Sequence, residues 1–159
     1  MSSCQPFNTK ALACLQISII LIDADPRGEH HCIGMPATAN AAAAFQAAGL
    51  EIVAQWGYPP ATQCAILRLF NQMVLTTAYG QYLDTQSLND EAAYWRQVEL
   101  KSAPFFGSAF HIGALAGGAD EETAVQLQQL GLLYGKLIQI HDDLGDTMAQ
   151  PATPDWEWV

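Results

Sequence analysis

Residues 120–148 read D-E-E-T-A-V-Q-L-Q-Q-L-G-L-L-Y-G-K-L-I-Q-I-H-D-D-L-G-D-T-M and form the clearest helix signal in the chain. Asp120 can cap this helix, and Glu121 and Glu122 place negative charge at the positive end of the helix dipole. Elsewhere the sequence has no sustained alternation of polar and apolar residues and no β-hairpin signal. The sequence therefore predicts an all-α fold.

Earlier helices are predicted at residues 10–22, 38–56, 61–83 and 91–102, and Pro104 marks a restart that runs to Gly117. The first is apolar on nearly every side, as expected of a helix that other helices enclose. Residues 25–37 contain several glycines and prolines, so we expect a loop there, with Thr38 as the cap of the next helix. Residues 84–90 should form a polar link.

The composition indicates one globular domain, residues 1–159. Hydrophobic residues make up 50% of the chain and charged residues only 14%, which excludes general disorder. The net charge of −10 would repel a polyphosphate backbone, so nucleic acid is not an expected partner.

The four cysteines form no C-x-x-C pair, and no leader-like pattern occurs at the N-terminus, so we expect a reduced, cytoplasmic setting. The longest strongly apolar run, Ile17 to Ile22, is far shorter than the roughly 20 residues that a membrane span requires. No transmembrane segment is expected.

An acidic cluster stands near the end of the last predicted helix. Asp142, Asp143 and Asp146 occupy positions i, i+1 and i+4, which places Asp142 and Asp146 on one side of the helix. Like charges at the negative end of a helix dipole are unfavourable, and Mg²⁺, which prefers oxygen ligands, would neutralise them. A solvated helix end with no bound ion explains the spacing equally well.

The neighbours of this cluster favour a binding site. Gln139 can hydrogen-bond a carboxylate or a ligand, and Gly131 and Gly135 allow another helix to approach closely. The segment from Gly131 to Asp146 resembles the second aspartate-rich motif, Q-x-x-D-D-x-x-D, of the trans-isoprenyl diphosphate (polyprenyl) synthases. This resemblance implies that Asp142, Asp143 and Asp146 hold Mg²⁺ on a substrate diphosphate. It also implies a partial isoprenoid synthase fold, an antiparallel helical bundle.

Two further segments resemble the same family. Residues 94–114 are similar to its lysine–threonine segment, which implies that Lys101 binds diphosphate, with Ser102 in place of threonine. Residues 78–84, A-Y-G-Q-Y-L-D, resemble its Gly-Gln segment and would place Gln81 near the active cavity. An ordinary surface lysine and a buried, satisfied glutamine are the alternatives. With Gln139, these residues make up the substrate-binding set.

The first acidic motif of the family is incomplete here. The stretch I-D-A-D-P-R-G-E-H-H-C-I-G-M-P, residues 22–36, keeps only Asp23 and Asp25, which point to opposite sides of a helix. Asp23 is the metal ligand that we expect from this stretch. Cys32 and Ile33 occupy the positions of the family's paired arginines, and the chain corresponds to about half of such an enzyme, its middle part.

The resemblance implies a Mg²⁺-dependent prenyltransferase that condenses an allylic diphosphate with isopentenyl diphosphate, with Lys101 and Asp142 as the catalytic residues. Prenyl diphosphates would be its substrates, and a homodimer or a heteromeric complex its working form. The incomplete first motif leaves two alternatives. One is a non-catalytic subunit that binds prenyl diphosphate or a partner protein, and the other is an inactive fragment of a longer synthase.

Overall fold

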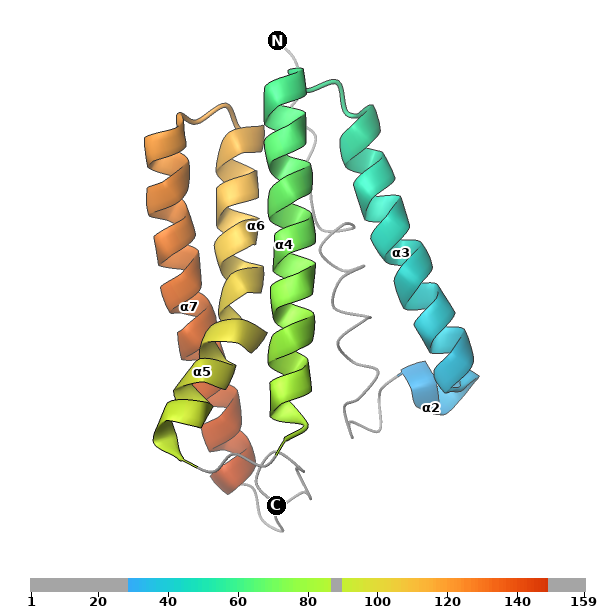
Figure 1. The fold of residues 1–159 in the computed structure, drawn as a ribbon, viewed down its shortest axis with the longest axis vertical. Helices are drawn as coiled ribbons and strands as arrows, with labels where there is room; N and C mark the ends of the chain where they lie inside the picture. The colour runs from blue at the N-terminus through green and yellow to red at the C-terminus, as the bar shows by residue number, and fades with distance from the viewer. Residues whose placement is uncertain (1–28, 87–89, 149–159) are drawn as a thin grey trace. The chain divides into compact units, whose positions relative to one another are not determined.

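The computed structural model describes residues 29–86 and 90–148, and these residues form helices and connecting turns without any strand (Figure 1). The helices are α2 (Glu29–Ile33), α3 (Met35–Gln55), α4 (Pro60–Asp84), α5 (Glu91–Lys101), α6 (Ala103–Ala116) and α7 (Glu121–Met148). The all-α prediction is confirmed. The helix expected at residues 10–22 lies outside the described residues. Two compact units, residues 1–67 and residues 68–159, divide the chain and are described separately.

The prediction of a loop at residues 25–37 is wrong for residues 29–37, which are the part of this stretch that the structure describes. Residues 29–33 form the short helix α2, and α3 already begins at Met35, with Pro36 in its first turn. Gly34 separates the two helices because its φ of 82° is a left-handed conformation that favours glycine. The sequence between the breakers is helix-compatible, so the glycine and proline limit the break to one residue.

Thr38 does not cap α3, as the sequence suggested, but lies buried within the helix. Its hydroxyl donates a 3.0 Å hydrogen bond to the carbonyl oxygen of Gly34, one turn earlier. A threonine hydroxyl can bond to a backbone carbonyl inside a helix as well as to an amide at its start, so the residue type alone does not fix the boundary.

The end of α3 follows the prediction. Gly57 has a φ of 77°, and Pro59 and Pro60 introduce α4. The side-chain amide of Gln63 donates to the carbonyl oxygens of Val53 and Ala54, at 3.0 and 2.6 Å. These bonds add donors to carbonyl oxygens in the last turn of α3, where the helix supplies few; the Val53 oxygen also accepts a 3.4 Å bond from the Trp56 amide.

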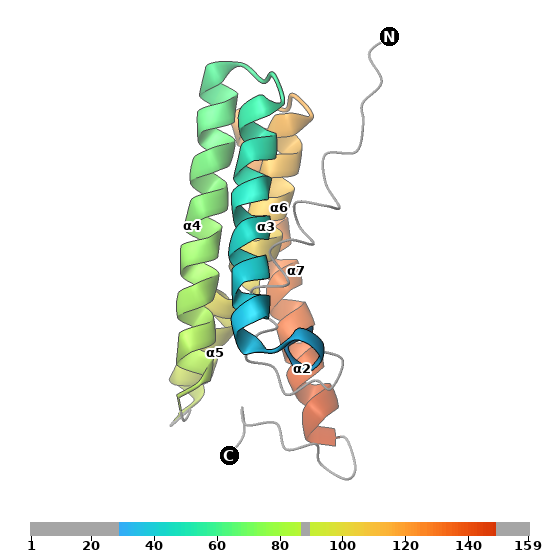
Figure 2. The same ribbon diagram turned by 90° about the vertical axis from the view of Figure 1, so that its right-hand side faces the viewer.

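In the second unit, α6 and α7 pack along each other, as Figures 1 and 2 both show. The helix α7 begins as expected, because the Asp120 carboxylate accepts a 2.8 Å hydrogen bond from the Thr123 amide. Its glycines make the contact close: a Cβ on Gly131 would lie 2.5 Å from the Phe106 carbonyl oxygen. Only glycine allows the two backbones to come this near.

The helix α7 carries many of its large apolar side chains on its exposed surface. The fully buried residues of the helix are small or polar. We call the exposed apolar set the outer stripe of α7: Leu130, Leu133, Tyr134, Leu137, Ile138, Leu144 and Met148. At the edge of this stripe, the Tyr134 ring also contacts Phe106 of α6. Leu133 keeps 65% of its surface exposed and Leu137 62%. This pattern is typical of a helix that packs against a partner on both sides.

Candidate functional site

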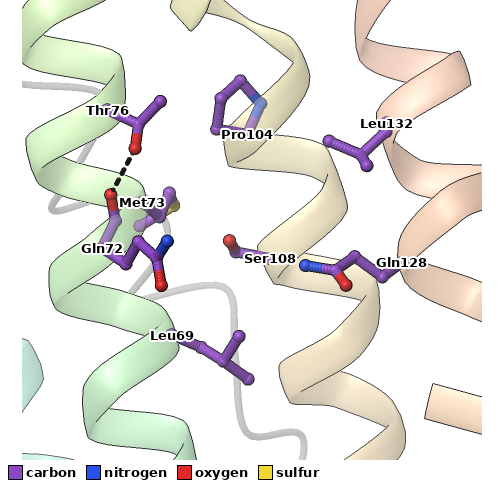
Figure 3. Close-up of a pocket in the computed structure, with 8 residues that line it drawn as sticks. All are labelled: Leu69, Gln72, Met73, Thr76, Pro104, Ser108, Gln128 and Leu132. Carbon is purple, nitrogen blue, oxygen red and sulfur yellow. Dashed lines mark hydrogen bonds between the residues drawn. The ribbon is translucent and has the colours of Figure 1, made fainter. Parts of the chain in front are cut away.

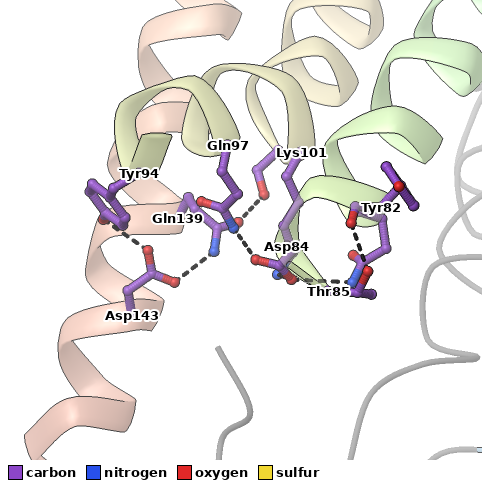
Figure 4. Close-up of polar contacts among 10 residues, drawn as sticks. Tyr82, Asp84, Thr85, Tyr94, Gln97, Lys101, Gln139 and Asp143 are labelled. Atoms are coloured by element: carbon purple, nitrogen blue, oxygen red, sulfur yellow. Dashed lines mark hydrogen bonds and ion pairs between the residues drawn. The ribbon is translucent and has the colours of Figure 1, made fainter. Parts of the chain in front are cut away.

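A cluster of polar side chains gathers where the end of α4, the helix α5 and the later part of α7 come together (Figure 4). At its centre is Asp84, the last residue of α4, which is only 2% exposed. The Lys101 ammonium, at the end of α5, lies 2.6 Å from the Oδ2 atom of Asp84. Because removing a charge from water is unfavourable, such a buried carboxylate needs close donors.

Two side-chain amides complete the surroundings of Asp84. The Nε2 atom of Gln97 donates to its Oδ1 atom, and the Nε2 atom of Gln81 donates to its Oδ2 atom at 3.2 Å. An ionised carboxylate only accepts hydrogen bonds, so both amides must turn their nitrogen atoms toward it. The Oε1 atoms of Gln81 and Gln97 are left without a partner among the described residues, at a cost of roughly 1–3 kcal/mol each.

Asp143 on α7 is the second buried carboxylate of the cluster. It accepts a 2.8 Å hydrogen bond from the Tyr94 hydroxyl and a 2.7 Å hydrogen bond from the Gln139 amide. The oxygen of that amide accepts a hydrogen bond from the Ser102 hydroxyl, which directly follows Lys101. A continuous chain of polar contacts therefore joins α5 to the acidic motif of α7.

Burial raises the pKa of Asp143, and the negative charge of Asp84 raises it further. The hydrogen bonds from Tyr94 and Gln139, together with the charge of Lys101, lower the same pKa but do not offset the burial. The ionised form is therefore disfavoured at this position, and an additional cation nearby would stabilise it.

The structure brings together four of the predicted site residues: Lys101, Gln81, Gln139 and Asp143. Asp142 lies one residue away on α7, with its side chain exposed. The side chain of Asp146 and the whole of Asp23 lie outside the described residues. Among the side chains that are described, no three metal-ligating groups converge, so metal ligation by these aspartates stays a prediction.

Sequence reasoning missed three members of the cluster: Asp84, Tyr94 and Gln97. Asp84 was expected in the polar link, but it ends α4 and is buried. Its place three residues after Gln81 was the available signal, because residues i and i+3 share a helix face. Gln97 likewise stands four residues before Lys101 on α5, and Tyr94 three residues before Gln97.

The chemistry of this cluster fits Mg²⁺. It contains two carboxylates, Asp84 and Asp143, and Mg²⁺ is a hard ion that prefers such oxygen ligands. Asp143, whose ionised form is disfavoured by burial, stands beside exposed Asp142 in the acidic motif. Among the described side chains of the cluster, Lys101 is the only cationic one, and a divalent cation at this end of α7 would offset the remaining negative charge.

A separate cavity of about 140 Å³ lies between α4, α6 and α7 (Figure 3). It is lined by Leu69, Gln72, Met73, Thr76, Pro104, Ser108, Gln128 and Leu132. Figure 3 shows side chains from all three helices pointing into it. None of the lining residues is charged, and none belongs to the predicted site, so this cavity is not suited to bind a diphosphate.

None of the described helices is long and apolar enough to cross a membrane.

Among the curated relatives, geranylgeranyl diphosphate synthase of Methanosarcina mazei is 39% identical over 74 residues, which are 44% of this chain and 23% of that protein. The chain therefore spans only a minor part of that relative's length.

Solved structures share the fold. Geranylgeranyl pyrophosphate synthetase from the archaeon Geoglobus acetivorans gives a TM-score of 0.76 at 24% identity, over 86% of this chain and 48% of that one. Geranyltransferase from Helicobacter pylori, complexed with magnesium and isoprenyl diphosphate, gives a TM-score of 0.76 at 18% identity, over 92% and 56%. The family model for polyprenyl synthetase matches residues 27–155, which is most of the sequence. The chain belongs to the polyprenyl synthetase family.

Proposed function

We propose that the chain acts in isoprenoid biosynthesis as a Mg²⁺-dependent prenyltransferase, which condenses an allylic diphosphate with isopentenyl diphosphate. The observation that carries this proposal is the polar cluster itself. It connects Lys101, through Ser102 and Gln139, to Asp143 in the acidic motif of α7. A cationic donor and a group of carboxylates on facing helices are the parts that a magnesium diphosphate requires.

Each residue of the cluster has a proposed part in binding. Lys101 would donate to oxygen atoms of the diphosphate, and Gln81, which shares the Asp84 carboxylate with Lys101, would lie beside the same ligand. Gln139 already bridges Ser102 and Asp143, so its part would be to hold the acidic motif in place as well as to contact substrate. Asp142, Asp143 and Asp146, with Asp23, would hold Mg²⁺, and Lys101 and Asp142 would be essential for turnover.

Mg²⁺, when bound, would supply Lewis-acid stabilisation of the leaving diphosphate. In the proposed reaction the allylic C–O bond breaks, and its electron pair leaves with the diphosphate. The double bond of isopentenyl diphosphate attacks the allylic cation, and a proton is then lost from the new carbon skeleton. Phe105 and Phe106, which follow Lys101 and Ser102, would help to exclude water from the cation.

The test is incubation of the purified protein with Mg²⁺, isopentenyl diphosphate and farnesyl diphosphate, followed by chromatography of the prenyl products. We expect a longer prenyl diphosphate from the wild type and a loss of about 100-fold or more from Asp142→Ala, because charge stabilisation at the leaving group dominates such reactions. Equal product from both proteins would refute the assignment of the acidic motif.

A second candidate function is binding without turnover. Cys32 and Ile33, exposed on α2, stand where the family resemblance places paired arginines, and arginine is suited to bidentate phosphate binding. Such a subunit would bind a prenyl diphosphate in a Mg²⁺-dependent way. Binding in calorimetry without product in the incubation would favour this function over catalysis.

The working form that we propose is a homodimer or a complex with another subunit. The outer stripe of α7 supports association, because it exposes large apolar side chains along most of the second half of the helix.

A further inference from the structure

We propose that Asp84, held by Gln81 and Gln97, is a positioning residue that fixes the Lys101 ammonium for a diphosphate ligand. This inference rests on the proposed function, because it concerns the lysine to which that function assigns diphosphate binding. The role that we assign to Asp84 differs from that of the acidic motif, because this buried carboxylate would not contact the substrate and would act only through Lys101.

The contacts around Asp84 specify one position for the ammonium group. Its Oδ1 atom accepts from Gln97, and its Oδ2 atom accepts from both Gln81 and Lys101. With both amides on the carboxylate, Asp84 cannot rotate without breaking hydrogen bonds in a place where water does not replace them. The Lys101 side chain has several rotatable bonds, and the 2.6 Å ion pair holds its end.

The direction of the amides supports this interpretation. Gln81 and Gln97 leave their Oε1 atoms without partners among the described residues, and both atoms are buried. Two glutamines with only a structural role would be more stable if those oxygen atoms also accepted hydrogen bonds. Here both side chains leave their oxygen atoms without acceptor contacts and donate to the same carboxylate. We take this as an indication that their role is to hold Asp84 in one position.

Gln97 and Lys101 also share a face of α5, since they are four residues apart. Both reach Asp84 from the same helix, and Gly80 lets the backbone of Leu100 and Lys101 lie directly against α4. The distance between α4 and α5 at this point, and with it the reach of Lys101, is therefore fixed by backbone contact. An exposed salt bridge has no comparable restraint.

Two measurements on the full chain test the proposal. The first is the rate at which an amine-acylating reagent modifies Lys101, followed by peptide mass spectrometry, with Lys136 as the internal reference. We expect Asp84→Asn to accelerate acylation of Lys101 about tenfold, because an amine released from the ion pair is more accessible to the reagent. The matched control is Glu99→Gln, which breaks the exposed 2.7 Å pair between Glu99 and Lys136 and should change neither lysine by more than about twofold.

The second measurement is calorimetric binding of inorganic pyrophosphate with Mg²⁺. We expect Asp84→Asn to weaken binding about tenfold, equivalent to roughly 1.4 kcal/mol. Gln97→Met is the second variant, in case Asp84→Asn folds poorly, because it retains the charges of Asp84 and Lys101 and favours the helix α5. We expect Gln97→Met to weaken pyrophosphate binding about threefold, because Asp84 loses one donor. Gln129→Met, on the exposed side of α7, is the control and should bind like the wild type.

The outcomes separate this inference from the proposed function. If the wild type binds pyrophosphate, Lys101→Ala does not, and both Asp84→Asn and Gln97→Met bind normally when folded, the positioning role is overturned while the proposed function stands. Unchanged acylation of Lys101 in Asp84→Asn would also overturn it. A wild type that binds no pyrophosphate with Mg²⁺ would contradict the proposed function, and this inference would fall with it.

Discussion

The hydroxyl of Tyr94 donates a 2.8 Å hydrogen bond to the Oδ2 atom of Asp143, across 49 residues of sequence. This bond ties α5 to the acidic motif of α7 and helps to stabilise a carboxylate that burial disfavours. The acidic motif is therefore a part of the fold of this unit and not only an appendage at the end of a helix.

Removing the Tyr94 hydroxyl should weaken this link. We expect Tyr94→Phe to lower the free energy of unfolding by about 1 kcal/mol, because a buried carboxylate loses a donor. It should also raise the pKa of Asp143 further, since the hydroxyl bond is one of the contacts that lower it. Urea unfolding measures the first effect, with exposed Tyr79→Phe on α4 as the control. Equal losses in the two variants would contradict the account.

The raised pKa of Asp143 predicts how stability depends on pH. The folded state binds the Asp143 carboxyl proton more tightly than the unfolded state does. The stabilisation that comes from this proton is therefore fully present below the pKa of Asp143 in the unfolded state. This stabilisation is lost as the pH rises through the pKa of Asp143 in the folded state. In metal-free buffer, we therefore expect the free energy of unfolding to fall with rising pH in the window above the ordinary aspartate value.

Asp143→Asn should remove this part of the pH dependence, whereas Asp142→Asn, whose carboxylate is exposed, should retain it. Thermal unfolding between about pH 4 and pH 7 measures the slope for the three proteins. A slope that persists unchanged in Asp143→Asn would show that another group produces it.

The glycines of α7 give a test of the helix packing. A Cβ on Gly131 would lie 2.5 Å from the Phe106 carbonyl oxygen, whereas a Cβ on Gly145 would meet nothing within 4 Å. We expect Gly131→Ala to destabilise the protein by about 1–3 kcal/mol through overpacking. Gly145→Ala should stabilise it by up to about 1 kcal/mol, because alanine favours the helix. Denaturant midpoints of the two variants should move in opposite directions.

The sequence predicted the helices well where residues with a single physical role mark their ends. Asp120 caps α7, and Gly57 with Pro59 and Pro60 separates α3 from α4. A helix cap, a glycine with positive φ and a proline at a helix start each restrict the backbone to few alternatives. Thr38 has more than one favourable place in a helix, and it misled the prediction of where α3 begins. Ambiguity of this kind is resolved only by the neighbours in space.

The residues of the candidate site were predicted where their chemistry is visible along the sequence, and they were missed where it depends on contacts between helices. The chemistry of Lys101 and the acidic motif is visible along the sequence, and Gln139 and Asp143 do lie one turn apart in contact. Asp84 was expected in the polar link of residues 84–90. Gln81, three residues earlier, is a local signal of its contacts, but its other two donors, Gln97 and Lys101, come from α5, and no local pattern predicts that approach.

The outer stripe of α7 predicts association of the purified chain. We expect light scattering to report a mass above that of the monomer at micromolar concentration, because several exposed leucines lie along one helix face. The double variant Leu133→Gln and Leu137→Gln should shift the mass toward the monomer. Val125→Gln, on another side of α7, is the control and should not change it.

The most direct test of the central claim is calorimetric titration of the protein with isopentenyl diphosphate and with farnesyl diphosphate, with and without Mg²⁺. The account predicts binding of a diphosphate that requires Mg²⁺ and weakens about tenfold or more in both Lys101→Ala and Asp142→Ala. Binding that is independent of Mg²⁺ and unchanged in both variants, or no binding of either compound, would contradict it.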